Sequence, residues 1–160
     1  MIFIGFAVGA PVAGWLSDRF CNRKWVMAIG TSLGLLLLMI ILYGPVMDEV
    51  LLGITIFCCG FFIAFYFVSF ATMREMNLSA VSGTSIGFIN MFNAFFGAIA
   101  TPMVGWVIDV AWHGHMLNGL REFNLHDYQV GLIILPVGLA LALAMLFFVK
   151  ETHAKPQEGL

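Results

Sequence analysis

The densest group of charged side chains in this sequence lies in one stretch, GWLSDRFCNRK, residues 14–24. It holds one acid, Asp18, and three permanent cations, Arg19, Arg23 and Lys24, between two long apolar runs. Lys and Arg resist translocation, so a short basic loop between two membrane spans stays in the cytoplasm. The stretch therefore predicts the orientation of the whole chain.

Only a few polar side chains interrupt the apolar runs. Tyr66 and Ser69 are three residues apart and share one helix face, and Asn90 and Asn93 stand in a later run. An asparagine that faces lipid is costly. We interpret these four residues as candidates that face a polar cavity within the helical bundle. The alternatives are hydrogen bonding between helices for the asparagines and simple packing for Tyr66.

Groups for other chemistry are weak in this sequence. No carboxylate stands in the middle of an apolar run, and no intramembrane nucleophile–base pair is visible, so we predict that the chain is not an enzyme. His113 and His115, with His126, Glu122 and Asp127 nearby, lack the fixed spacing of known zinc sites. The sequence predicts no metal site, no cofactor and no nucleic-acid partner.

Composition indicates the class of protein. Of the 160 residues, 61% are hydrophobic and 10% are charged, against about 45–50% and 25% in soluble domains. We therefore expect an all-α, polytopic membrane bundle, with lipid around it. The predicted spans are residues 2–16, 25–43, 50–72, 83–108 and 128–149, followed by a polar, unstructured tail, 150–160. The first is short, because a span needs about 20 residues.

Small residues recur at helical spacing in two of these runs. Gly5, Gly9 and Ala13 step by four, a spacing that lets two membrane helices approach closely. The fourth run carries a longer stripe, which must face protein or a polar cavity because it includes Asn90. Its predicted helix-packing members are Gly83, Gly87, Gly97, Thr101 and Gly105.

The five spans place the 17–24 loop, the 73–82 loop and the tail on one side. That side holds six of the seven cations, namely Arg19, Arg23, Lys24, Arg74, Lys150 and Lys155. The prediction is a cytoplasmic C-terminus and an N-terminus outside.

The basic stretch resembles the loop signature of the major facilitator superfamily, with matches at Gly14, Asp18, Arg19, Arg23 and Lys24. Cys21 stands where that signature has Gly. The segment REMNLSAVSGTSIGFINMFNAFFGAIATPMVGWVID resembles the eleventh helix of bacterial members, and FFVKETH resembles the exit from the twelfth. The chain is thus similar to the C-terminal part of a twelve-helix transporter, from a partial helix eight to helix twelve.

The resemblance implies a function and a partner. Superfamily members move a small solute by alternating access between two six-helix halves, so a missing N-terminal half and a bacterial inner membrane are expected. The resemblance makes Tyr66, Ser69, Asn90 and Asn93 candidates that line the solute pathway. The motif acid of the family contacts a helix end in the opposite half, which gives Asp18 a gating role. The alternative is a charged loop that only sets topology. For the whole chain, the alternative is a truncated or split-gene membrane protein without transport activity of its own.

Overall fold

The computed structural model describes residues 1–77, 81–112, 116–117, 120–121 and 123–153. Nearly all of them are helical, as the sequence predicts. The elements are α1 (Ile2–Phe20), α2 (Arg23–Tyr43), α3 (Glu49–Ile63), η1 (Ala64–Phe67), α4 (Val68–Met76), α5 (Ser82–Ala111), β1 (Met116–Leu117), β2 (Leu120–Arg121), α6 (Leu125–Gly131), α7 (Ile134–Met145) and η3 (Leu146–Phe148). The two-residue strands pair antiparallel in the connection between α5 and α6.

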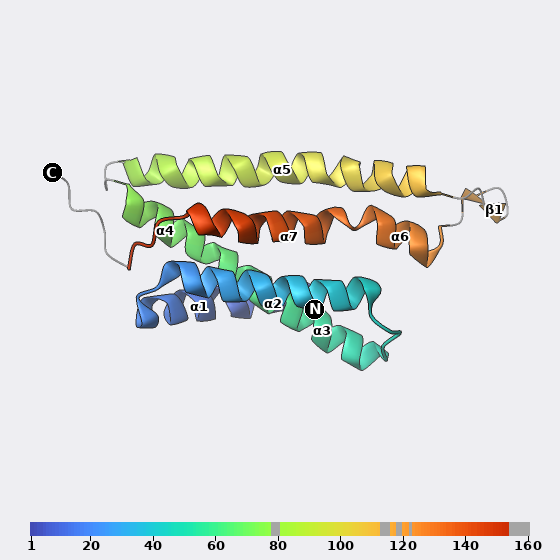
Figure 1. Ribbon diagram of the computed structural model, residues 1–160, viewed down its shortest axis with the longest axis horizontal. Helices are drawn as coiled ribbons and strands as arrows, with labels where there is room; N and C mark the ends of the chain where they lie inside the picture. Colours follow the sequence, from blue (N-terminus) through green and yellow to red (C-terminus); the bar gives the residue numbers. More distant parts are fainter. Residues whose placement is uncertain (78–80, 113–115, 118–119, 122, 154–160) are drawn as a thin grey trace.

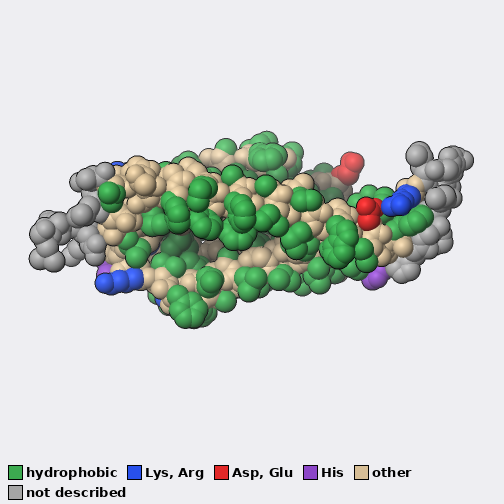
Figure 2. All heavy atoms as spheres, turned by 90° about the horizontal axis from the view of Figure 1, so that it is seen from above, with side chains coloured by type: hydrophobic (Ala, Val, Ile, Leu, Met, Phe, Trp, Pro, Cys, Tyr) green, Lys and Arg blue, Asp and Glu red, His purple; other side chains and the backbone are tan. Residues whose placement is uncertain are grey.

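Within the described residues, four helical segments have the length and apolar character needed to cross a membrane. They are α2, the run α3–η1–α4 over Glu49–Met76, α5, and the run α6–α7–η3 over Leu125–Phe148. Helix α1, with 19 residues, is the fifth long helix, and its last turns carry Asp18 and Arg19. Figure 2 shows hydrophobic side chains along the length of the bundle and charged ones near its two ends.

Helices α2 and α5 and the α6–α7 run lie roughly parallel, while the α3–η1–α4 run crosses them obliquely (Figure 1). Helices α1 and α2 both pack against α3, and α7 packs against α2. Helix α5 contacts α4 near its beginning and α6 near its end. Most of the buried residues lie on α1, α2, α3, η1 and α4, while none of the residues of α5 is buried.

The small-residue seam of α1 is confirmed as a close helix contact. Gly5, Gly9 and Ala13 are buried. A Cβ atom added at Gly5 would run into the carbonyl oxygen of Phe57, and one at Gly9 into that of Phe61. Glycine is required here because the backbones of α1 and α3 touch with no room for a side chain.

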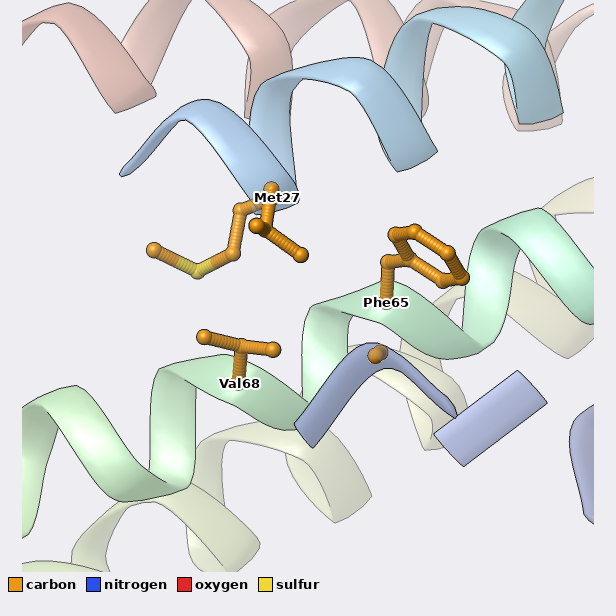
Figure 3. Close-up of a cluster of buried hydrophobic side chains, with 5 residues drawn as sticks. Met27, Phe65 and Val68 are labelled. Atoms are coloured by element: carbon orange, nitrogen blue, oxygen red, sulfur yellow. The ribbon is translucent and has the colours of Figure 1, made fainter. Parts of the chain in front are cut away.

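The buried apolar cluster lies where α1, α2, η1 and α4 meet. It consists of Ala13, Val26, Met27, Phe65 and Val68, and Figure 3 shows Met27 of α2 above Phe65 and Val68 of the α3–η1–α4 run. This cluster is next to the polar end of α1, because Ser17 follows Ala13 by one turn and is also fully buried. Packing thus fixes the helix ends that carry the basic loop.

The stripe on α5 differs from the seam on α1. No atom of the described residues lies within 4 Å of a Cβ added at Gly83, Gly87, Gly97 or Gly105. Thr101 is exposed and its hydroxyl donates to the carbonyl oxygen of Gly97 in its own helix. The same sequence pattern is therefore packed within the chain on α1 and open on α5.

Candidate functional site

The basic stretch forms a tight turn between α1 and α2. Cys21 caps α1 in the left-handed region, at φ 48° and ψ 36°, where glycine is the favoured residue. Asn22 caps α2, since its side chain accepts a hydrogen bond from the backbone N–H of Trp25 at 3.0 Å. The turn keeps the left-handed geometry although Cys21 replaces glycine, and it places Arg23 in the first turn of α2.

Arg23 is the central residue of the site and is only 5% exposed. Its guanidinium donates to Ser17 Oγ at 2.9 Å and to Asp18 Oδ1 at 2.5 Å, both on α1. It also forms a forked pair with Glu75 of α4, at 2.5 Å to Oε1 and 3.3 Å to Oε2. One cation therefore connects the ends of three helices.

Glu75 is held in a helix, whereas the sequence placed it in a loop. Helix α4 continues to Met76, so Arg74 and Glu75 occupy its last turns. The Glu75 side chain is 12% exposed, against 70% for Asp18. A charge-assisted, forked pair with a shielded carboxylate is stronger than a single bond to an exposed one. Glu75, rather than Asp18, is the principal partner of Arg23.

The segment after the last helix is docked on the same turn, so the expectation of an unstructured tail is wrong for Glu151–His153. Glu151 accepts hydrogen bonds from the backbone N–H groups of Arg23 at 2.9 Å and Lys24 at 2.7 Å. These are free donors at the beginning of α2, where the helix dipole also favours a carboxylate. Thr152 donates its hydroxyl to Glu75 Oε2 at 2.5 Å. The tail thus connects α2 to α4.

The environment of Glu151 favours its charged form. Burial alone would raise the pKa of this carboxyl, but backbone N–H groups of Lys24, Arg23, His153 and Thr152 donate to it and lower the pKa below its ordinary value of 4.5. Lys24 adds a further connection, because its Nζ donates to the carbonyl oxygen of Phe147 at 2.9 Å. We call the set Ser17, Asp18, Arg23, Glu75, Glu151 and Thr152 the Arg23 network.

The other predicted members of the motif loop lie outside this network. Arg19 is exposed and stands over the ring of Trp15, with 5.9 Å from Cζ to the ring centroid. A Cβ added at Gly14 would meet no atom within 4 Å among the described residues. The structure therefore brings Asp18, Arg23 and Lys24 together around the turn and leaves Gly14 and Arg19 at its periphery.

Of the four predicted pathway residues, two lie on the η1–α4 part of the third span and two on α5. Tyr66 is 37% exposed, and its ring packs on Phe67 at 4.3 Å and Phe70 at 6.4 Å between centroids. Ser69 is half-buried, while Asn90 and Asn93 are exposed. Among the described residues, no hydrogen bond joins the first pair to the second. Their role in a pathway stays a prediction.

The histidine-rich connection is described only in part. His113, His115 and Glu122 lie outside the described residues. Asp127 is buried and belongs to a capping box with Asn124 at the beginning of α6. Within the part of the chain that the structure describes, no three His, Cys, Asp or Glu side chains form a group that could hold a metal ion.

The bundle of apolar helices and the basic turn between α1 and α2 agree with a comparison with protein families. The profile of the Major Facilitator Superfamily matches residues 1–160. The chain belongs to this superfamily. No curated protein and no solved structure matches it. As in other major facilitator proteins, its helices are those of a membrane transporter that moves a small solute.

Sequence reasoning missed four of the six residues of the Arg23 network in this major facilitator chain. Ser17, Glu75, Glu151 and Thr152 were not among the predicted site residues. One signal was present: the predicted basic side of the membrane also carries Glu75 and Glu151. Acids among six cations on one side are candidates for ion pairs, and Ser17 lies one helical turn after the buried Ala13.

Proposed function

We propose that the Arg23 network is the cytoplasmic gate of this transporter and that the network is closed in the conformation described. One observation carries the proposal: a single buried guanidinium, Arg23, ties α1 to α4, while Glu151 ties the tail to α2. Alternating access requires helix ends at one face to separate and rejoin. A set of charge-assisted hydrogen bonds between different helices can break and re-form as a unit.

Not every member contributes equally to holding the gate. Arg23 and Glu75 are both shielded from solvent, so their pair is little weakened by water and salt. Asp18 is largely exposed, which limits its contribution and leaves its second oxygen available to a helix outside this chain. We propose that Asp18 makes that additional contact while Arg23 and Glu75 hold this chain's own helices.

The basic side is proposed to be cytoplasmic, in a bacterial inner membrane, with the N-terminus outside. The Arg23 network, the last turns of α4 and the tail meet at one end of the bundle. Arg121 of β2 pairs at 3.1 Å with Asp109 in the last turn of α5, away from the Arg23 network. The excess of cations at the Arg23 end supports this orientation.

We also propose that helices outside this chain, the N-terminal half of the transporter, cover the open stripe of α5. Asn90 and Asn93 are exposed on α5 and no glycine of the stripe has a neighbour within the described chain. Such a face would be unfavourable against lipid, because amide groups would lose their hydrogen bonds there. The solute pathway would then run between α5, the η1–α4 segment with Tyr66 and Ser69, and the covering helices.

The gate is testable with a thiol placed beneath Arg23. Ser17 is fully buried, so the thiol of Ser17→Cys, in a Cys21→Ser background, reacts with a maleimide only when the network opens. We expect slow labelling, accelerated about tenfold or more by Glu75→Gln, since loss of a charged hydrogen-bond partner costs about 1.5–3 kcal/mol. The matched control is Asp109→Asn, which removes the ion pair between α5 and Arg121 of β2. It is expected to leave the labelling rate of Ser17→Cys unchanged.

The native cysteines test orientation in the chain without these substitutions. Cys21 is exposed in the turn, while Cys59 is buried and Cys58 half-buried within the third span. A membrane-impermeant maleimide is therefore expected to label Cys21 in inside-out vesicles and not in right-side-out vesicles. Labelling of Cys21 only in right-side-out vesicles would show the opposite orientation. Equal rates of Ser17→Cys labelling with and without Glu75→Gln would contradict the proposal that the Arg23 network is a gate.

A further inference from the structure

The Arg23 end of the bundle carries cations that the network does not use. Arg19, Lys24, Arg74 and Lys150 form no ion pair with a carboxylate among the described residues. The described acids of this end are already engaged. Asp18 and Glu75 bind Arg23, and Glu151 accepts from backbone N–H groups. Among the described residues, no carboxylate is left for these cations, so they are open to an anion from outside the chain.

Two of the cations are held where a membrane surface must lie. Lys24 is the second residue of the α2 span, and Lys150 follows the end of the last span, Leu125–Phe148, by two residues. The Lys24 ammonium donates to the carbonyl oxygen of Phe147 at 2.9 Å, which fixes it at the seam between α2 and η3. An ammonium has three donors, and two of those of Lys24 remain for another acceptor.

Exposed aromatic side chains lie on the helix ends near this turn. Trp15, Phe20, Trp25, Phe147 and Phe148 are all more than 60% exposed, the last two at 78% and 87%. Trp residues with one apolar and one polar edge gather at the interface between headgroups and hydrocarbon. This places the lysines at the depth of lipid phosphates, and it favours a lipid over a soluble protein or a free ion.

We propose that the seam between α2 and η3, formed by Lys24, Trp25, Phe147, Phe148 and Lys150, binds the headgroup of an anionic phospholipid. The lysine ammonium groups donate to the phosphate oxygens, and the exposed phenyl rings lie along the beginning of the acyl chains. A zwitterionic headgroup is bound less tightly, because its own cation is repelled by the lysines. Each lysine near the surface is worth about 1 kcal/mol of attraction to anionic lipid, which is about a fivefold change in relative affinity.

The experiment uses Trp25 as the reporter. In a variant with Trp15, Trp106 and Trp112 replaced by Phe, quenching of Trp25 by brominated phosphatidylglycerol is compared with quenching by brominated phosphatidylcholine in mixed vesicles. We expect phosphatidylglycerol to be preferred, and Lys24→Gln and Lys150→Gln each to reduce the preference about fivefold. The matched reporter is a variant that keeps only Trp106, which is 67% exposed on α5 near its far end. It is expected to show little preference.

Three results would overturn the proposal. They are equal quenching of Trp25 by the two lipids, a preference that survives both lysine substitutions, and loss of lipid in favour of inorganic phosphate at millimolar concentration. Lys150 makes no hydrogen bond within the described residues, so Lys150→Gln keeps the test valid even if Lys24→Gln perturbs the α2–η3 seam. The Arg121→Gln variant, at the other end of the bundle, is expected to leave the lipid preference of Trp25 unchanged.

Discussion

The Arg23–Glu75 pair gives the sharpest energetic prediction. In Arg23→Met, the Glu75 carboxylate, whose side chain is 12% exposed, loses both bonds from the guanidinium and keeps that from Thr152. Breaking a buried pair by removing one partner costs about 3–5 kcal/mol. Because the site lies at the end of the bundle, we expect the lower value, about 3 kcal/mol. Asp18→Asn is expected to cost below about 1 kcal/mol, since Asp18 is 70% exposed.

A double-mutant cycle separates the pair from the rest of the network. The assay is reversible unfolding in micelles with a rising fraction of denaturing detergent, followed by helical circular dichroism. We expect a coupling energy of about 2–3 kcal/mol between Arg23→Met and Glu75→Leu, and below about 1 kcal/mol between Arg23→Met and Asp18→Asn. The control is Arg121 with Asp109, a pair that is 52% and 58% exposed. A coupling energy for Arg23 and Glu75 no larger than that of this exposed pair would refute the reasoning.

Three further predictions follow from single positions. Gly9→Ala is expected to destabilise the bundle by about 1–3 kcal/mol in the same unfolding assay, because the methyl group meets the backbone of Phe61. Gly87→Ala is the control, and it is expected to leave the stability unchanged because the space around Gly87 is open. Cys21→Gly is expected to stabilise by about 1 kcal/mol, since it relieves a positive φ; an unchanged midpoint would contradict this. The pKa of Glu151 is lowered in the folded protein, so the docked tail is stabilised at neutral pH and loses this contribution as the pH falls through that lowered value. Hydrogen exchange of the first amides of α2 is expected to rise there, and Glu151→Gln to remove the pH dependence.

The sequence predicted the helices well because their apolar runs are long and their ends are marked by charges or by Gly44–Pro45. The seam of Gly5 and Gly9 was predictable for the same kind of reason. Two glycines on one helix face need a close neighbour, and α3 supplies it. The identical argument does not locate the neighbour of Gly87, because no described part of the chain reaches it.

The candidate site was predictable in part. Charge identified Arg23 and Lys24, because cations are rare in this chain. Charge alone placed the emphasis on Asp18, which lies five residues from Arg23, rather than on Glu75, which lies 52 residues away. The pairing depends on how α4 packs against α1 and α2, and on its continuing through Glu75. No local pattern in the sequence encodes that tertiary contact.

The tail shows the same limit. The segment Glu151–His153 is polar and short, which favoured an unstructured end. Its order comes from backbone N–H groups at the beginning of α2 that need an acceptor, and Glu151 supplies one. The local sequence does not predict this contact, because it forms only when the fold brings the Glu151 carboxylate beside the beginning of α2.

The most direct test of the gate is a reversible cross-link between the tail and the turn. The ring Nδ1 of His153 lies 3.3 Å from the carbonyl oxygen of Cys21, so His153→Cys places a second thiol beside the native one. In vesicles that contain the complete transporter, with Cys58 and Cys59 replaced by Ala, solute transport is measured before oxidation, after oxidation and after reduction. Our account predicts that the cross-link forms, that it stops transport, and that reduction restores transport. Transport at an unchanged rate in fully cross-linked protein would contradict the proposal that this end must open.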